Sequence, residues 1–260
     1  MSDLVIYEKQ GKIGLIKLNR PPVNSYNHDM VVALGKAIDE IRFDDQVQVG
    51  ILTGAKHGMF SAGADINMLK NADPDYKAMF CLNCQETLTK MESTPKLFIA
   101  ALGGTCVGGG LEQALACDLR FMTDNPKAVI GLPEITLGVL PGTGGTQRLP
   151  RLVGKGRALD LMITGKLIGA QEAHRIGLVE YVFPDAEFMD KTLEHAERMA
   201  NGPARAVNLI KRSVQEGTEL DLRGGLALER ELQNRLFATQ DAKEGLSAFV
   251  EKRKPQFSGR

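Results

Sequence analysis

The stretch VGGGLEQALACD, residues 107–118, places three consecutive glycines at the start of a predicted helix, with Glu112 close behind them. Glycine lets a backbone bend tightly and brings main-chain N–H groups close to a ligand. The first turn of a helix adds unpaired N–H donors and a partial positive charge. The stretch therefore predicts a small anion-binding turn that also carries a carboxylate.

The segments around this turn alternate between predicted strands and predicted helices. Compact apolar runs favour strands at 4–7, 13–18, 47–53, 97–102, 119–122 and 129–130, and helical spacing of apolar residues favours helices at 27–41, 74–91 and 110–117. After about residue 143 only 179–183 is strand-like, and amphipathic helices are expected at 185–200, 204–215, 220–237 and 242–251. This order predicts an α/β core followed by a helical region.

The balanced charge of the chain argues against several classes of partner. Its 260 residues include 32 Lys and Arg and 32 Asp and Glu, so no net charge draws it toward nucleic acid or an anionic membrane. Non-catalytic RNA binding would need a basic stripe, and only short clusters occur, at 148–151 and 252–254. No apolar run is long enough to span a membrane and no targeting signal is evident, so a cytoplasmic location is expected.

Two cysteines, Cys81 and Cys84, form a C-x-x-C pattern. A zinc site would need a second close pair, but Cys106 and Cys117 stand well apart. A redox pair normally begins a helix, whereas this pair falls in the middle of a predicted one. The sequence therefore favours small buried side chains, and no metal site is expected.

A second stretch, ILTGAKHGMFSAGAD at 51–65, is physically similar to the region around the three glycines. Like LFIAALGGTCVGGGLE at 97–112, it runs from an apolar strand into small residues that leave backbone amides approachable. Two amides from separate loops, aimed at one point, form an oxyanion hole. Small residues also allow close packing of backbone segments, and composition alone leaves both interpretations open.

The glycine-rich loops do not fit the common phosphate-binding patterns. Neither has the Lys-Ser/Thr ending of a P-loop, and in PGTGGTQRL, residues 141–149, Gln147 stands where a dinucleotide fingerprint needs its last glycine. Ser61 lacks the G-x-S-x-G setting of a serine hydrolase. The bound anion is better explained as a carbonyl oxygen that gains charge during a reaction.

Two glutamates could transfer the proton that such a reaction needs. Glu112 lies in the first helical turn, which favours an ionised carboxylate, although a helix N-terminus favours acidic residues without any catalytic role. Glu134 is the one charged residue of IGLPEITLG, residues 130–138, where apolar neighbours favour the protonated form unless the loop is exposed. Unequal settings of this kind separate an acid from a base.

Four longer motifs make the chain similar to the enoyl-CoA hydratase (crotonase) family. They are FSAGADI at 60–66, GGTCVGGGLEQALACDLRF at 103–121, GLPEITLGVLPGTGGTQRLPRLVG at 131–154 and EGLSAFVEKRKPQF at 244–257. The resemblance implies an α/β spiral of ββα units that forms the catalytic core over 1–198, and a helical trimerisation region over 199–260. It further implies a homohexamer, built as a dimer of trimers, or a homotrimer.

The resemblance also implies a reaction: the reversible syn addition of water across the 2,3 double bond of a 2-enoyl-CoA, as in fatty acid β-oxidation. The backbone amides of Ala64 and Gly109 would hold the thioester oxygen. Glu112 would help activate the water, Glu134 would deliver a proton to C2, and the Gly142 amide would orient the water. Coenzyme A enters as part of the substrate, and no metal or other cofactor is expected, because the thioester and the amides carry the electron demand.

Further matched positions imply where the substrate and its CoA lie. Lys252 would reach the CoA phosphate from a neighbouring subunit. Two departures from the family pattern stand near the mouth of the site: Asn24-Ser25-Tyr26 replaces the common N-A-L, and Asn67 replaces a common lysine. The positions that the resemblance assigns to substrate and CoA binding are Val23, Ser25, Ala62, Asp65, Ile66, Leu132, Phe249 and Lys252.

Two alternatives remain within the same resemblance. A Δ3,Δ2-enoyl-CoA isomerase shuttles one proton without water and generally needs a single glutamate, so the presence of both Glu112 and Glu134 favours a hydratase. A hydratase of cyclic substrates, such as cyclohexenecarbonyl- or dienoyl-CoA, differs only in the acyl group, and the sequence does not give that group.

Overall fold

The computed structural model describes residues 3–259 and confirms the predicted α/β core. The first pair of neighbouring strands in its large sheet is antiparallel, and the other pairs are parallel. The order of this six-stranded sheet is β1 (Val5–Gln10), β2 (Ile13–Leu18), β3 (Val49–Gly54), β5 (Leu97–Leu102), β7 (Leu119–Thr123) and β9 (Tyr181–Phe183). A smaller parallel sheet has the order β4 (Gly58–Ser61), β6 (Gly104–Val107) and β8 (Ile130–Gly131).

Successive strands alternate between the two sheets, and this produces a spiral. β3, β5 and β7 enter the large sheet, and β4, β6 and β8 follow them into the small one. Only loops of small residues are predicted from the sequence where β4 and β6 lie, and this prediction is wrong. These strands are short and contain glycine because their backbones approach closely: a Cβ added to Gly104 would lie 1.9 Å from the carbonyl carbon of Gly58.

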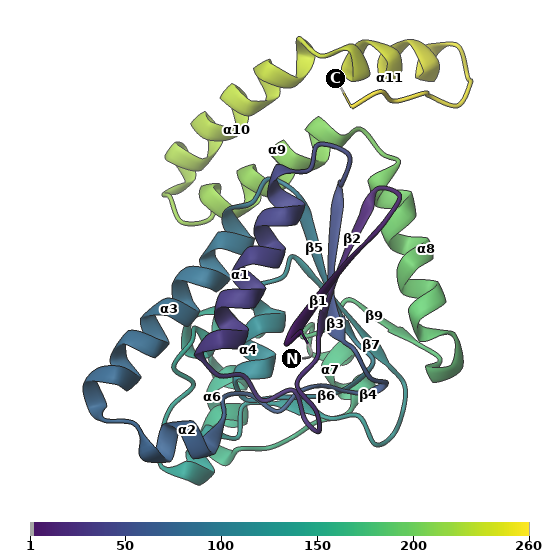
Figure 1. Cartoon of the computed structure of the whole chain (residues 1–260). Coiled ribbons are helices and arrows are strands. Elements are labelled where there is room, and N and C mark those ends of the chain that lie inside the picture. The colour runs from purple at the N-terminus through teal and green to yellow at the C-terminus, as the bar shows by residue number, and fades with distance from the viewer. Residues whose placement is uncertain (1–2, 260) are drawn as a thin grey trace.

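Helices cover both faces of the large sheet (Figure 1). α1 (His28–Phe43), α3 (Pro74–Ser93) and α4 (Gly109–Leu115) pack on one face, and α8 (Phe188–Ala200) packs on the other. Neighbouring residues of a strand point to opposite faces, so Leu52 joins the first core and Ile51 the second. The central strands are thus buried on both sides, which is typical of parallel sheets between helices.

The C-terminal region is helical, as predicted. α8 is followed by α9 (Ala204–Gly217), α10 (Leu222–Phe237) and α11 (Gln240–Val250), and the predicted division at 198/199 falls in the last turn of α8. Several elements between the strands were not predicted, partly because glycines and Pro150 obscure the helical pattern of α5. They are α2 (Ile66–Asn71), η1 (Glu134–Leu137), α5 (Gly145–Val153), α6 (Lys155–Thr164) and α7 (Ala170–Arg175). The helix predicted over 185–200 begins with the 3₁₀ turn η2 (Asp185–Glu187), which α8 follows.

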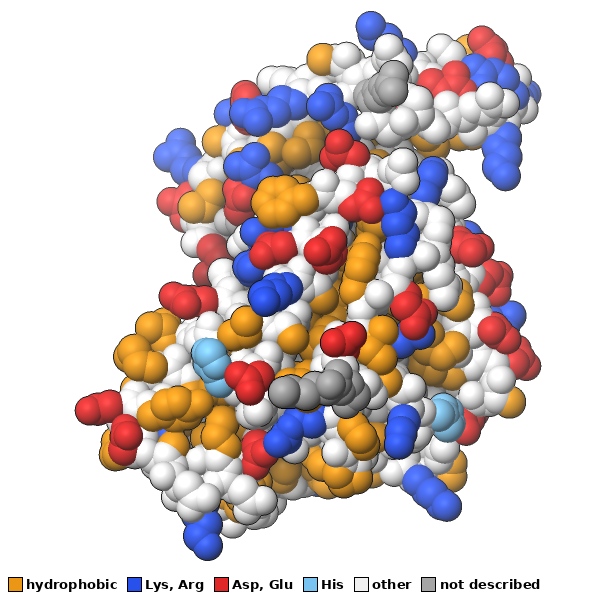
Figure 2. Space-filling model, in the orientation of Figure 1, with side chains coloured by type: hydrophobic (Ala, Val, Ile, Leu, Met, Phe, Trp, Pro, Cys, Tyr) orange, Lys and Arg blue, Asp and Glu red, His pale blue; other side chains and the backbone are white. Residues whose placement is uncertain are grey.

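The surface mixes charges of both signs. On the face seen in Figure 2, basic and acidic side chains are interspersed over the body and over the projecting C-terminal helices, in keeping with the balanced composition. α10 and α11 extend away from the body (Figure 1), and Leu222 and Phe249 on them are 78% and 85% exposed. Within residues 3–259, no helix combines the length and the apolarity needed to cross a membrane.

A buried ion pair attaches α9 to the core. The Lys211 ammonium lies 2.8 Å from the Asp118 carboxylate and donates to the Lys96 carbonyl at 2.8 Å. Asp118 also accepts the Phe98 backbone N–H at 2.7 Å, and both charged side chains are less than a tenth exposed. Each buried charge is therefore compensated by the other and by backbone groups.

Replacing Lys211 with alanine is expected to lower the free energy of unfolding by about 3 kcal/mol, because the Asp118 charge is left buried without its partner. The matched control is Arg212→Ala, which removes the exposed pair with Glu216 on the same helix and should cost about 0.5 kcal/mol or less. Urea denaturation of both variants checks this. Equal losses in the two variants would contradict a contribution from burial.

Candidate active site

The two glycine-containing turns identified in the sequence lie against each other. Parallel pairing of β4 with β6 brings the ends of these strands together. A Cβ added to Gly63 would lie 2.9 Å from the Gly109 nitrogen, so the two turns are in contact. Gly63 and Gly108 have φ angles of +89° and +57°, in the left-handed region that favours glycine. The turns therefore meet at one point, as an oxyanion hole requires.

The backbone amides of Ala64 and Gly109 make no hydrogen bond to a backbone acceptor in the described part of the chain. The preceding amide is occupied, since Gly108 N–H donates to the Gly131 carbonyl at 2.9 Å. Gly109 begins α4, and the first N–H groups of a helix have no partner inside it. Both amides are available to an oxygen that gains negative charge.

Glu112 is buried next to these turns and is only 2% exposed. Its Oε1 accepts the backbone N–H groups of Thr143 at 2.8 Å and Gly145 at 2.7 Å, and its Oε2 accepts the Thr143 hydroxyl. These donors fix the orientation of the carboxylate. Gly145 leaves room for it, since an added Cβ there would lie 3.1 Å from Glu112 Oε1.

Thr143 is in turn held from its other side. The Arg148 guanidinium donates to the Thr143 carbonyl at 3.0 Å and to the Glu92 carboxylate at 2.6 and 2.7 Å. Thr143 was not predicted as a site residue, because its partner Glu112 lies 31 positions away and no local pattern links the two. The PGTGG turn, which fails as a nucleotide-binding motif, supports Glu112 instead.

Glu134 lies over the glycine turn at the start of η1. Its Oε1 would be 3.2 Å from a Cβ added to Gly108, and its Oε2 is buried without a hydrogen-bond partner among residues 3–259. Burial, and to a lesser degree the charge of Glu112, raises the pKa of Glu134 to about 7. The direction of this change agrees with the predicted effect of apolar surroundings on Glu134. A carboxyl with this pKa can donate or accept a proton near neutral pH.

Gly142 belongs to the turn that carries Thr143. Its carbonyl accepts a hydrogen bond from the Gln85 side chain at 2.8 Å. The Gly142 N–H has no backbone acceptor within the described residues. The Cys81 sulfur lies 3.5 Å from where a Cβ on Gly142 would stand. This amide is therefore free to bind a small molecule close to Glu112.

The predicted CoA positions near the first loop, residues 19–27 between β2 and α1, lie together. The Val23 carbonyl accepts the Ala62 N–H at 2.9 Å. The Arg20 guanidinium joins the Ser25 carbonyl and the Asp65 carboxylate, both at 2.6 Å, and its hydrogen bond is the main cause of the lowered pKa of Asp65. Ile66 begins α2 and is half exposed. The Arg20 links were not predicted, and they tie the first loop to the turn that carries Ala64.

The remaining predicted positions are dispersed. Leu132 is fully buried next to Gly145. Phe249 lies on α11 and Lys252 just after it, at the opposite end of the molecule from α2 (Figure 1). A single chain therefore does not bring Phe249 and Lys252 to Glu112.

The cysteines are free thiols, and Cys81 and Cys84 stand in the middle of α3, as predicted. Burial raises the pKa of Cys84 to about 12, which leaves its thiol protonated and unreactive at neutral pH. Among residues 3–259, no group of three or more His, Cys, Asp or Glu side chains is arranged to hold a metal ion.

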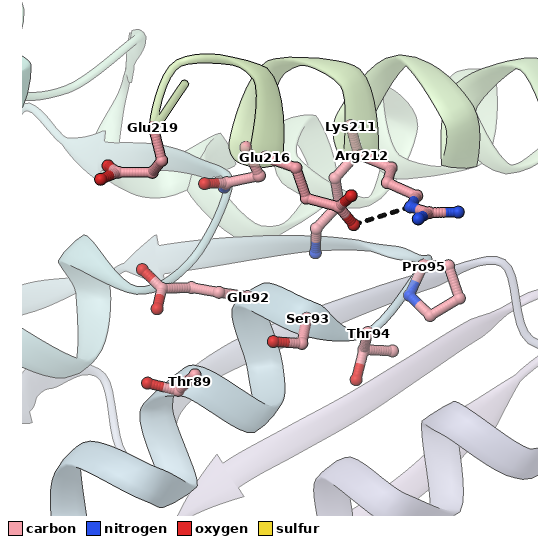
Figure 3. Close-up of a pocket in the computed structure, with 10 residues that line it drawn as sticks. Thr89, Glu92, Ser93, Thr94, Pro95, Lys211, Arg212, Glu216 and Glu219 are labelled. Carbon is pink, nitrogen blue, oxygen red and sulfur yellow. Dashed lines mark hydrogen bonds and ion pairs between the residues drawn. The ribbon is translucent and has the colours of Figure 1, made fainter. Parts of the chain in front are cut away.

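A separate cavity of about 750 Å³ lies between the end of α3 and α9 (Figure 3). Neither Glu112 nor Glu134 lines it. Its walls carry charges of both signs, and Arg212 and Glu216 pair with each other at 2.7 Å across one edge. This cavity lacks the free amides and the unpaired acid found at the glycine turns, so we place the candidate active site at the turns.

Known proteins are similar to this chain over nearly its whole length. The profile of the enoyl-CoA hydratase/isomerase family matches residues 8–260. The chain is 40% identical to a short-chain-enoyl-CoA hydratase of Clostridium acetobutylicum, over 96% of this chain and 95% of the relative. It is 39% identical to a crotonyl-CoA hydratase of Syntrophomonas wolfei, over 97% of each. A crystal structure of an enoyl-CoA hydratase from Geobacillus kaustophilus superposes with a TM-score of 0.97 at 50% identity, covering 100% of this chain and 98% of the other.

Proposed function

Because the chain belongs to the enoyl-CoA hydratase/isomerase family, we propose that it adds water reversibly to a 2-enoyl-CoA thioester and forms a 3-hydroxyacyl-CoA. The family matches also confirm the predicted crotonase-type spiral. The observation that carries the proposal is the convergence of two carboxyl groups, Glu112 and Glu134, on the two adjoining turns that present the free amides of Ala64 and Gly109. A base, an acid and an anion-binding pair are what the hydration of a thioester needs.

In the proposed reaction the two amides hold the thioester oxygen while it becomes an enolate oxygen. Glu112 removes a proton from water as the water oxygen attacks C3, with the water oriented by the Gly142 amide. The π electrons move to the thioester oxygen and return as C2 takes the proton of Glu134. Glu112 ends protonated and Glu134 ionised, so the pair carries one proton before and after the reaction.

The proposed position of CoA is across the first loop, next to Val23, Ser25 and Ile66. Phe249 and Lys252 would come from a neighbouring subunit, in a homotrimer or in a hexamer of two trimers. Phe249 lies on the projecting α11 and is 85% exposed, and Lys252 follows that helix, which supports a role outside their own chain. The proposal needs no metal ion, because the amide pair polarises the thioester.

The direct test is a hydration assay with purified protein, following the loss of enone absorbance. Straight-chain and cyclic 2-enoyl-CoA thioesters should be compared, since the acyl group is unassigned. We expect hydration of at least one class, with the preferred length or ring shown by kcat/KM. Inactivity toward every thioester would remove the proposed function. A product whose double bond has moved without the addition of water would identify an isomerase.

The pKa of Glu134 predicts how the reaction depends on pH. Hydration starts with Glu134 protonated and Glu112 ionised. Dehydration starts with Glu112 protonated and Glu134 ionised, so each direction needs one proton on the pair. Because the overall equilibrium involves no free proton, kcat/KM must fall in both directions together. We expect a decline of about tenfold per pH unit above pH 7, where the pair loses its last proton.

Initial rates between pH 6 and 9 with substrate below KM, in both directions, check this expectation. Circular dichroism over the same range controls for unfolding. A rate that stays constant up to pH 9, in a protein that remains folded, would contradict an acid with a pKa of about 7.

A further inference from the structure

Tyr26 stands where the family pattern N-A-L has leucine, and it lies against the turns of Ala64 and Gly109 and beside Thr143. We infer that Tyr26 is a positioning residue: its backbone fixes the turn of Ala64, its ring seats the turn of Gly109, and its hydroxyl steadies the Thr143 hydroxyl that binds Glu112. This inference rests on the proposed hydration and assigns a residue to it that the matched motifs do not include.

The backbone of Tyr26 holds the first turn on both sides of Ala64. Tyr26 N–H donates to the Gly63 carbonyl at 2.9 Å, and Asp65 N–H donates to the Tyr26 carbonyl at 2.9 Å. Tyr26 and Ala64 therefore form a parallel bridge. The bridge engages the Gly63 carbonyl and the Asp65 N–H. It leaves the Ala64 N–H itself without a backbone acceptor among the described residues.

The ring of Tyr26 lies directly against Gly109. A Cβ added to Gly109 would be 2.0 Å from the Tyr26 hydroxyl oxygen and 2.7 Å from the ring carbon that carries it. The ring is 3% exposed and stacks on Phe80 with 6.0 Å between centroids. Because the ring is packed on both sides, it fixes the position of the backbone that presents the Gly109 amide.

The hydroxyl of Tyr26 lies beside the groups that bind Glu112. Burial is the main cause of its raised pKa, and the charge of Glu112 raises the pKa further. The Thr143 side chain is its hydrogen-bond partner. The phenol is therefore protonated at neutral pH. A carboxylate can only accept, so the Thr143 hydroxyl donates to Glu112 and its oxygen is left to accept from Tyr26.

This arrangement separates two effects of the side chain. The ring acts on the amides that would hold the thioester oxygen, and the hydroxyl acts through Thr143 on the base. A leucine at this position could pack near Gly109 but could not reach Thr143 with a donor. Tyr26→Phe should therefore disturb the base alone, and Tyr26→Leu should disturb both the base and the amides.

The test measures hydration kinetics and the polarisation of a bound thioester in Tyr26→Phe, Tyr26→Leu and a matched control, Tyr7→Phe. Tyr7 also has a buried hydroxyl, which has no partner among residues 3–259, and it lies on β1 away from the site. Cinnamoyl-CoA reports polarisation, because its absorbance band moves to longer wavelength when the carbonyl oxygen accepts strong hydrogen bonds.

We expect Tyr26→Phe to lower kcat about tenfold with little change in KM and with the absorbance shift of bound cinnamoyl-CoA retained, as for the loss of one hydrogen bond next to a base. Tyr26→Leu should lower kcat further and reduce the absorbance shift. Tyr7→Phe should match the wild type. Thr143→Val combined with Tyr26→Phe should cost less than the product of the two single losses, because both act on Glu112.

A Tyr26→Phe variant with wild-type kcat would overturn the inference, and so would a loss of the absorbance shift in that variant, since the hydroxyl would then act on the amides. Independent effects of Tyr26→Phe and Thr143→Val would overturn the link through Thr143. If Tyr26→Leu fails to fold, Tyr26→Phe and the double variant still test the role of the hydroxyl. Absence of hydration in the wild type would count against the proposed function and is distinct from these outcomes.

Discussion

Glu112→Gln is expected to lower kcat/KM for hydration about a thousandfold, because an amide cannot take the proton of the attacking water. The local structure should survive the change. The glutamine carbonyl oxygen can still accept the N–H groups of Thr143 and Gly145, and its NH₂ group can donate to the Thr143 hydroxyl, which can rotate. A loss of activity would then report on chemistry and not on packing.

The measurement for Glu112→Gln pairs the hydration assay with an isomerisation assay on a 3-enoyl-CoA. Isomerisation needs only one proton carrier, so any such activity should persist through Glu134. Glu219→Gln is the matched control, since Glu219 is exposed and pairs with Arg151 on the surface. A reduction of less than tenfold in hydration would contradict the role of Glu112 as the base.

Gly109→Ala is expected to reduce hydration by a factor of about a hundred or more. Its new Cβ would stand 2.0 Å from the Tyr26 hydroxyl oxygen, so either the ring or the turn must move. In both cases the Gly109 amide leaves its position, and the loss of one oxyanion donor costs about 3 kcal/mol of transition-state stabilisation. Thermal unfolding should show a lower Tm as well, because the clash lies in the core.

Gly156→Ala is the control for Gly109→Ala, as Gly156 lies in α6 with nothing within 4 Å of an added Cβ. This control should retain full activity and gain up to about 1 kcal/mol in stability from the higher helix propensity of alanine. Gly109→Ala with wild-type kcat/KM would show that the Gly109 amide does not hold the thioester oxygen.

The long apolar strands and the helices with clear periodicity could be predicted from the sequence, because burial on both faces leaves a strong local pattern. β2, β3, β5 and β7 are examples. β4 and β6 could not, since their glycines serve a close approach between strands that is visible only in three dimensions. The same holds for α5, whose start depends on glycines and whose interior contains Pro150.

The candidate site was predictable where its chemistry is local. Glu112 in a first helical turn and Glu134 among apolar residues could both be recognised, and the raised pKa of Glu134 follows from the burial that its neighbours imply. Thr143 and Tyr26 were missed as supports of Glu112, because these residues meet only in the folded chain. For Tyr26, the signal was an aromatic residue in place of the usual leucine.

The central claim is that one acid and one base add the elements of water to C2 and C3 of a thioester held by two backbone amides. It is tested most directly by incubating the wild type with a 2-enoyl-CoA, either in H₂¹⁸O or in D₂O, and analysing the product by mass spectrometry. We predict a 3-hydroxyacyl-CoA with one ¹⁸O at C3 in the first solvent and one deuterium at C2 in the second. A product with deuterium but no ¹⁸O, and with its double bond moved, would contradict the account.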